Sequence, residues 1–336
     1  MTDRGKIDRP FFDDVIYPNL GADRDDVALG PTHGVDFGVL DVGGRAIVAA
    51  TDPVSILPDL GWERAARFAL GVVLADVAVS GIPPSHLAIS FSLPPELRDD
   101  EFAAVWETMA DDLSDLGTTV LTGHTARYAG CSFPWVGGAT VLGVGDHEDV
   151  IRPDGARPGD HLLVTHGPAV EATALFAALF PDDIDLPDDV LARQAERLPS
   201  TEHVRDALVA AASGPVTAMH DATECGLQGA LVELAAGAGV RLDVDSAATP
   251  VSDEAAAICD ALEMEPWAAT TSGSLLVAVR PEGVDAVVEA LESRGTPVAD
   301  AGRVRDGDGV YVDGERVEHP GEDPAWRVWA ELSGGE

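Results

Sequence analysis

The sequence predicts a two-domain fold of the α/β or α+β class, and three observations support this prediction. Short apolar runs typical of strands alternate with longer stretches typical of helices along the whole chain. With 336 residues, the chain is long enough for two domains of ordinary size. Residues 151–160 contain two prolines and two glycines, and this composition marks them as the boundary between the domains.

The first unit is expected to begin with an irregular arm and a hairpin. Residues 1–30 are polar and interrupted by prolines and glycines, so we expect an N-terminal arm there. Residues 35–40 and 46–50 have the composition of strands, and Gly43 and Gly44 between them are typical of a tight hairpin turn. The arm therefore leads into a pair of strands.

A long helix is predicted after the hairpin. Residues 61–79 are mostly apolar, and Gly81 with the two prolines that follow it closes this stretch. The other elements expected in the first unit are a helix at 96–116 and strands at 87–93, 118–121 and 136–144. Strands and helices therefore mix within one domain, which we place at residues 31–150.

The second unit repeats this mixture, and we place it at residues 158–318. Its predicted strands are 161–165, 242–244, 275–279 and 309–312. Its predicted helices are 169–180, 190–197, 202–212, 227–237 and 284–293.

The charge balance is the most unusual bulk property of the chain. It has 59 acidic residues against 21 basic ones, which gives a formal net charge of −38. Self-repulsion at this charge destabilises a compact state in dilute buffer, whereas 1 M salt shortens the Debye length to about 3 Å and screens most of it. Because the acids are spread along the chain, we interpret them as halophilic adaptation and not as a patch for a basic partner.

Several classes of protein are disfavoured by the composition. There is no basic stripe of the kind that binds nucleic acid. No apolar run reaches the roughly 18 to 20 residues that span a bilayer, and the N-terminus has no apolar signal region. Three cysteines without paired spacing argue against a disulfide framework or a zinc site. We therefore expect a soluble, cytoplasmic protein with a small-molecule substrate, and no nucleic-acid or membrane partner.

Three aspartates of the first unit lie beside apolar elements, where a carboxylate is costly unless it has a partner. Asp36 comes two residues after Gly34, which permits a tight turn and the close approach of a phosphate. Asp52 ends a predicted strand, and Asp76 lies within the helix predicted at 61–79. Singly, each could be a turn acid, a cap or a buried structural group. Together they favour Mg²⁺, which binds one or two carboxylates plus substrate phosphates.

A second group of polar residues stands before the helix predicted at 227–237: His220, Asp221, Thr223 and Glu224. The backbone N–H groups at the start of that helix could meet an anion. His220 and Asp221 are neighbours and could form an oriented pair, although adjacent residues on a strand point in opposite directions.

In combination, these stretches resemble the aminoimidazole ribonucleotide (AIR) synthetase superfamily, whose fold is called PurM-like. Its relatives include selenophosphate synthetase and thiamine-monophosphate kinase, and the chain is most similar to the hydrogenase-maturation protein E and archaeal AIR synthase-related branch. The resembling stretches occur in family order over about residues 30–315: 34–40, 51–53, 76–81, 121–125, 159–160 with 167–173, and 220–227.

The resemblance implies a homodimer in which the N-terminal sheets of two subunits form a shared barrel, with ATP and Mg²⁺ as cofactors in a cleft beside it. It implies that magnesium is held by Asp36, Asp52 and Asp76. It implies contacts to ATP, partly through a glycine-rich phosphate-side loop, from Gly34, Gly123, His124, Thr125 and Arg127. It assigns the substrate side and catalysis to His220, Asp221, Thr223 and Glu224.

The chain departs from the family pattern at several positions. Ala75 stands where many relatives have asparagine before the third aspartate. His124, Ala126 and Arg127 replace the aspartate and lysine of the hydrogenase-maturation phosphate loop, and His124 could either position a phosphate or simply bond to backbone. Cys225 replaces a glycine; it could be a nucleophile, but a small residue filling a former glycine site is the simpler interpretation. The C-terminus lacks the terminal cysteine of hydrogenase maturation, and no early nucleophile suits selenophosphate synthesis.

These observations favour an ATP- and Mg²⁺-dependent enzyme that transfers the γ-phosphoryl group to an oxygen of an amide or other small-molecule substrate, in the manner of a ligase, cyclo-ligase or kinase. Two alternatives remain open. One is a kinase of the thiamine-monophosphate type, whose phosphorylated product persists. The other is a nucleotide-binding maturation or sensor protein without turnover.

Overall fold

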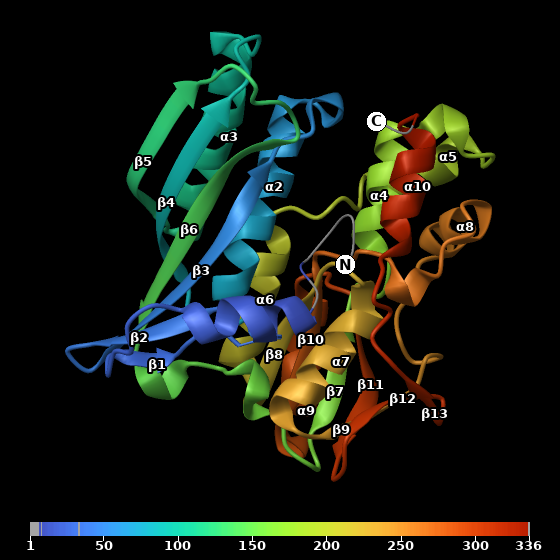
Figure 1. Cartoon of the computed structure of the whole chain (residues 1–336). Helices are drawn as coiled ribbons and strands as arrows, with labels where there is room; N and C mark the ends of the chain where they lie inside the picture. The colour runs from blue at the N-terminus through green and yellow to red at the C-terminus, as the bar shows by residue number, and fades with distance from the viewer. Residues whose placement is uncertain (1–6, 8, 33, 335–336) are drawn as a thin grey trace.

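The computed structural model describes residues 7, 9–32 and 34–334, and it confirms the mixed two-domain fold (Figure 1). Two sheets are present, one of six strands and one of seven. Among the helices of the described ranges, none is long and apolar enough to cross a membrane.

The first sheet has the strand order β1-β2-β3-β6-β4-β5. Its strands are β1 (Val27–Leu29), β2 (Gly38–Val42), β3 (Arg45–Ser55), β4 (Pro84–Leu93), β5 (Thr119–Arg127) and β6 (Trp135–Gly145). The hairpin between β2 and β3 forms as predicted, since Gly43 and Gly44 both have positive φ angles, of 63° and 83°. Helices α2 (Trp62–Ala78) and α3 (Asp99–Leu116) pack along one side of this sheet and bury its core (Figure 1).

The segment predicted as an N-terminal arm is more ordered than expected. It contains α1 (Arg9–Phe11), further helical turns at Phe12–Ile16 and Tyr17–Asn19, and the strand β1, which pairs with β2. Residues 1–6 and 8 of the predicted arm lie outside the described residues. The sheet therefore begins inside the segment that composition marked as irregular, because three residues are too few for a periodic pattern.

The second sheet has the strand order β13-β12-β9-β11-β7-β10-β8. Its strands are β7 (His161–Thr165), β8 (Val216–Ala222), β9 (Arg241–Val244), β10 (Ser274–Val279), β11 (Val298–Arg305), β12 (Gly309–Val312) and β13 (Glu315–Val317). Helices α6 (Glu202–Ser213) and α9 (Val284–Ser293) cover one face, and α7 (Gly226–Ala238) covers the other. A third apolar cluster joins α4 (Val170–Leu179), α5 (Asp188–Ala195), α8 (Asp253–Ala261) and α10 (Pro324–Leu332).

The two sheets share one continuous core, because α2 of the first packs on α6 of the second. Gly71 is at the point of contact. A Cβ there would lie 2.6 Å from the carbonyl oxygen of Ser200, so only glycine permits this approach. The imidazole Nε2 of His203 bonds to the carbonyl of Gly71 at 3.1 Å, and burial lowers the pKa of His203 to about 4. This close packing fixes the position of α2, and therefore of Asp76, against the second sheet.

Candidate functional site

Four carboxylates meet where the two sheets adjoin. Asp36 precedes β2, Asp52 lies on β3, Asp76 is near the end of α2, and Asp221 is on β8. Burial raises the pKa of Asp76 well above its ordinary value, and the charges of Asp221, Asp52 and Asp36 raise it further. A hydrogen bond with Asp52 also favours the protonated form of Asp76. The structure therefore brings together the three aspartates that the sequence assigned to magnesium, and it adds Asp221 of the second sheet, which the sequence assigned to the substrate side.

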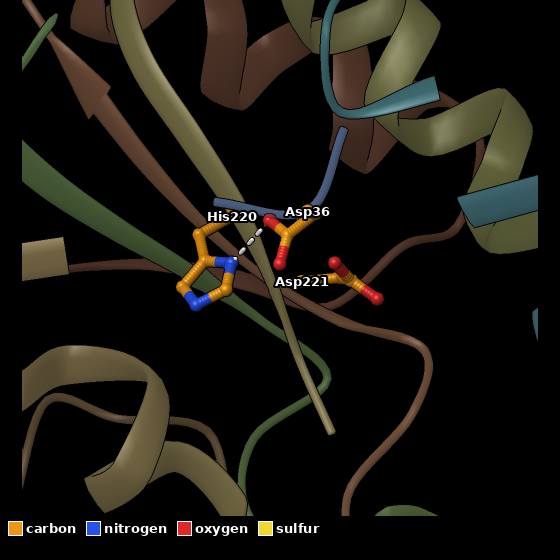
Figure 2. A group of neighbouring side chains, drawn as sticks. All are labelled: Asp36, His220 and Asp221. Atoms are coloured by element: carbon orange, nitrogen blue, oxygen red, sulfur yellow. Dashed lines mark hydrogen bonds and ion pairs between the residues drawn. The ribbon is translucent and has the colours of Figure 1, made fainter. Parts of the chain in front are cut away.

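His220 connects this cluster to the second sheet (Figure 2). Its Nδ1 lies 2.6 Å from Oδ2 of Asp36, and its Nε2 lies 3.0 Å from Oε2 of Glu233 on α7. The imidazole side chain is only 3% exposed. Burial alone would lower the pKa of His220, but Asp36 and Glu233 outweigh burial and raise it well above 6.5. His220 is therefore a buried imidazolium that donates a hydrogen bond from each ring nitrogen.

The adjacent residues His220 and Asp221 both reach this site, although they lie on opposite faces of β8. β8 is the edge strand of its sheet; one of its faces packs in the core shared with α2, and the other packs against α7. His220 extends towards α7, whereas Asp221 lies close enough to Asp76 to raise its pKa. Ligand atoms of Asp36, His220 and Asp221 lie within 4.8 Å of one another. Figure 2 shows these three side chains as neighbours.

Gly34 allows the Asp36 segment to approach α7. Its φ angle is +77°, and a Cβ would lie 3.2 Å from Cβ of Glu233, so a side chain would push the segment away from the helix. The observed role of this glycine is packing between the two halves of the molecule. Its predicted contact with phosphate stays a prediction.

The predicted phosphate loop is not a loop. Gly123, His124 and Thr125 belong to β5, which was expected to end near Gly123 but continues to Arg127. Gly123 shares a transverse row with Asp52, because Asp52 pairs with Ala139, Ala139 with Ile89, and Ile89 with Gly123. Three strand spacings separate the two ends of this row, roughly 14 Å. Since neighbouring residues of a strand alternate between faces, the side chain of His124 is on the face opposite to that of Asp52.

The side chains of β5 therefore do not join the carboxylate cluster within one chain. Nε2 of His124 lies 2.9 Å from the hydroxyl of Tyr128. Arg127 donates to the carbonyl of Leu97 and, at 2.7 Å, to the carboxylate of Asp99. Thr125 and Arg127 line a hollow of about 320 Å³ beside α3.

The C-terminal segment contacts the turn that follows Asp221. Oε1 of Glu224 accepts a hydrogen bond from Nε1 of Trp326 (2.8 Å), and the backbone N–H of Cys225 donates to Asp323 (2.8 Å). Cys225 has a φ angle of 64°, in the left-handed region that glycine adopts most easily. The helix start that was expected to meet a substrate anion thus binds a carboxylate of the protein itself.

Family models match both halves of the chain. The N-terminal domain of AIR synthase related proteins matches residues 34–145, and the C-terminal domain matches residues 157–315. The chain belongs to the AIR synthase related protein family. This confirms the resemblance that the sequence motifs indicated.

This AIR synthase related chain is similar in sequence or in fold to several proteins whose activities or ligands are named. It is 26% identical to carbamoyl dehydratase HypE of Rhizobium leguminosarum bv. viciae over 83% of this chain and 79% of that protein. It is 28% identical to selenide, water dikinase of Nitratidesulfovibrio vulgaris over 84% and 86%. Its fold matches E. coli HypE (TM-score 0.71, 22% identity, 84% and 88% covered) and AaThiL complexed with AMPPCP and TMP (0.68, 22%, 86% and 90%). HypE in complex with ATP has a TM-score of 0.66 at 19% identity, covering 95% and 97%.

Sequence reasoning missed two glutamates near this site, the partly buried Glu233 and the buried Glu171. Glu233 is the only charged residue of α7, and Glu171 is the only charged residue of α4. A single charge in an apolar helix is the signal that could have revealed both, as it did for Asp76. Burial raises the pKa of Glu171 to about 7, although the backbone N–H of Ser272 donates to its carboxylate at 3.0 Å.

The pKa of Glu171 predicts a pH-dependent stability. An acid whose pKa rises on folding stabilises the folded state at low pH, and this contribution is lost as the pH rises from about 4.5 through 7. Glu171→Gln removes the titrating carboxyl, so the unfolding free energy of the variant should not fall over this pH interval. Relative to wild type, the variant should gain up to roughly 3 kcal/mol of unfolding free energy between the two ends of the interval. Denaturant titrations at several pH values measure the difference. Glu289→Gln, at an exposed position of α9, is the control, and parallel curves for Glu171→Gln and wild type would contradict the assignment.

Proposed function

We propose that this chain is an ATP- and Mg²⁺-dependent enzyme that transfers a phosphoryl group to an oxygen atom of a small-molecule substrate. The observation that carries the proposal is the convergence of Asp36, Asp52, Asp76 and Asp221 at the junction of the two sheets. Relatives described with ATP or AMPPCP support a nucleotide as one substrate.

The residues present fit a divalent cation. Four carboxylates lie close together in a largely buried place, and their mutual repulsion adds to burial in raising the pKa of Asp76 well above its ordinary value. An all-oxygen donor set is the type that magnesium prefers. Asp36, Asp52 and Asp76 would hold the ion, which when bound neutralises charge on the nucleotide phosphates.

The remaining residues of the site would position the reacting groups. His220 already donates both of its N–H groups, so in this arrangement it holds Asp36 and Glu233 in place and is not a free proton donor. Asp221 brings a carboxylate from the second sheet, where it would accept a hydrogen bond or a proton from the attacking group. Glu224 and Thr223 follow in the turn towards α7. Catalysis by such a site is mainly orientation and charge stabilisation, which suits its lack of an obvious nucleophile.

The second candidate function is that of a small-molecule kinase, whose phosphorylated product persists. The fold is shared with AaThiL, which is described with AMPPCP and TMP, so a small-molecule kinase uses the same architecture. Analysis of the product by mass spectrometry distinguishes the two outcomes. A stable phosphate ester supports a kinase, and release of phosphate with a dehydrated or ligated product supports an activation step.

Loss of the carboxylates should abolish turnover. Asp52→Asn and Asp76→Asn should each lower the rate of Mg²⁺-dependent ATP turnover by at least about 100-fold, because each removes a ligand of the ion. The assay is phosphate release in about 1 M KCl, which screens the acidic surface. Asp59→Asn changes an exposed aspartate of the same domain and should leave the rate unchanged. Unchanged turnover in both cluster variants would refute the proposal.

A homodimer through the first sheet is part of the same proposal. The face opposite α2 and α3 carries an apolar row, in which Leu40 pairs with Ile47 and Ile47 with Val144. Leu40 is 38% exposed and Val144 is 40% exposed. A second copy covering this row would bury it.

A charge placed in that row should weaken the dimer. Val144→Glu should raise the dimer dissociation constant at least about tenfold, because the carboxylate would be desolvated on association. Sedimentation velocity measures the shift. Val251→Glu, at an equally exposed valine (44%) of the second domain, should leave the dimer intact. A monomeric wild type, or a dimer that tolerates Val144→Glu, would exclude this interface.

A further inference from the structure

Arginines without a carboxylate partner are uncommon in this acidic protein, and two of them border the same hollow. Among the described arginine side chains, the ones without a carboxylate within ion-pair distance are Arg64, Arg157, Arg197 and Arg280. Arg64 donates to the carbonyl of Ala195. Arg157 and Arg280 line a hollow of about 480 Å³ together with Arg152. With 59 acids in the chain, a hollow lined by three arginines calls for a specific explanation.

The walls of this hollow are fixed by backbone contacts. Gly155, in the connection between the two sheets, packs so tightly that a Cβ would collide with the carbonyl oxygen of Thr217. The backbone N–H of Arg280 donates to the carbonyl of Pro215 at 3.2 Å, next to the pairing of β8 with β10. The segments that carry Arg152, Arg157 and Arg280 are thus held against one another before any ligand arrives, and this lowers the entropy cost of binding.

Two carboxylates near the hollow, Asp154 and Asp160, already have partners, and none of the residues that line it is acidic. Asp154 pairs with Arg152 through two bonds, of 2.8 and 2.7 Å. Asp160 is buried, and its Oδ2 accepts from the backbone N–H of Arg157 and from the hydroxyl of Thr217. The guanidinium groups of Arg157 and Arg280 therefore remain available, and the hollow carries net positive charge.

We propose that this hollow binds a small phosphorylated anion, recognised by Arg157 and Arg280. The planar guanidinium group donates two parallel hydrogen bonds to phosphate oxygens, a geometry that a solvated lysine does not offer. The volume falls within the range of roughly 300–1,000 Å³ that small-molecule sites occupy. The hollow is distinct from the carboxylate cluster, because Thr217 near the start of β8 and Asp221 near its end are four residues apart, about 13 Å.

Calorimetric titration with inorganic pyrophosphate tests this site. The titration is made with EDTA and without Mg²⁺, so that the carboxylate cluster has no cation to attract the probe. Wild type should bind one pyrophosphate with a dissociation constant below roughly 1 mM. The double variant Arg157→Gln/Arg280→Gln should bind at least tenfold more weakly, and Arg280→Gln alone should show an intermediate loss.

Two controls make the result specific. Arg197→Gln removes an arginine without a carboxylate partner that lies outside the hollow, and it should bind pyrophosphate as wild type does. Asp52→Asn alters the carboxylate cluster and should also retain binding, which separates this site from the proposed ATP site. Absence of binding to wild type, equal binding to the double variant, or loss of binding in Asp52→Asn would each overturn the proposal.

Discussion

The buried ion pair between His220 and Asp36 joins the two halves of this protein, and the geometry of its candidate site depends on it. His220 belongs to the second sheet and Asp36 to the segment that enters the first, so the pair connects positions 184 residues apart. Two buried charges are costly to desolvate, and the pair is sustained because Glu233 satisfies the other ring nitrogen. Removal of His220 would leave the carboxylates of Asp36 and Glu233 without the cation between them, at a cost of about 3–5 kcal/mol. The close contact of α2 with α6 supports the same junction from the other side and places Asp76 beside Asp221.

Two positions that depart from the family pattern, Cys225 and His124, have physical explanations in this structure. Cys225 occupies a left-handed conformation that ordinarily favours glycine, and the bond from its N–H to Asp323 offsets part of that strain. Asp323 belongs to the C-terminal segment, which therefore contributes to the turn after Asp221. His124 is on β5, the edge strand of the first sheet. A histidine at this position, in place of the residue that the family has, therefore does not disturb the carboxylate cluster of the same chain.

Local signals allowed the sequence to predict the hairpin at Gly43 and Gly44, the long apolar helix and the convergence of Asp36, Asp52 and Asp76. These residues could be found because a carboxylate beside apolar sequence is energetically unusual wherever it occurs. The rest depends on long-range pairing. The row from Asp52 to Gly123 exists only because β6 inserts between β3 and β4, which no local pattern records. The partners Glu233 and Asp323 likewise lie 13 and 98 residues from the groups they bind.

We expect Asp36, Asp52 and Asp76 together to hold a divalent cation bound to a nucleotide. A crystal structure with Mn²⁺ and AMPPCP tests it most directly, because manganese reports its own position by anomalous scattering. We expect an anomalous peak with carboxylate oxygens of Asp36, Asp52 and Asp76 in its coordination shell and phosphate oxygens completing it. Nucleotide bound elsewhere, or manganese with no ligand among these three aspartates, would contradict the claim.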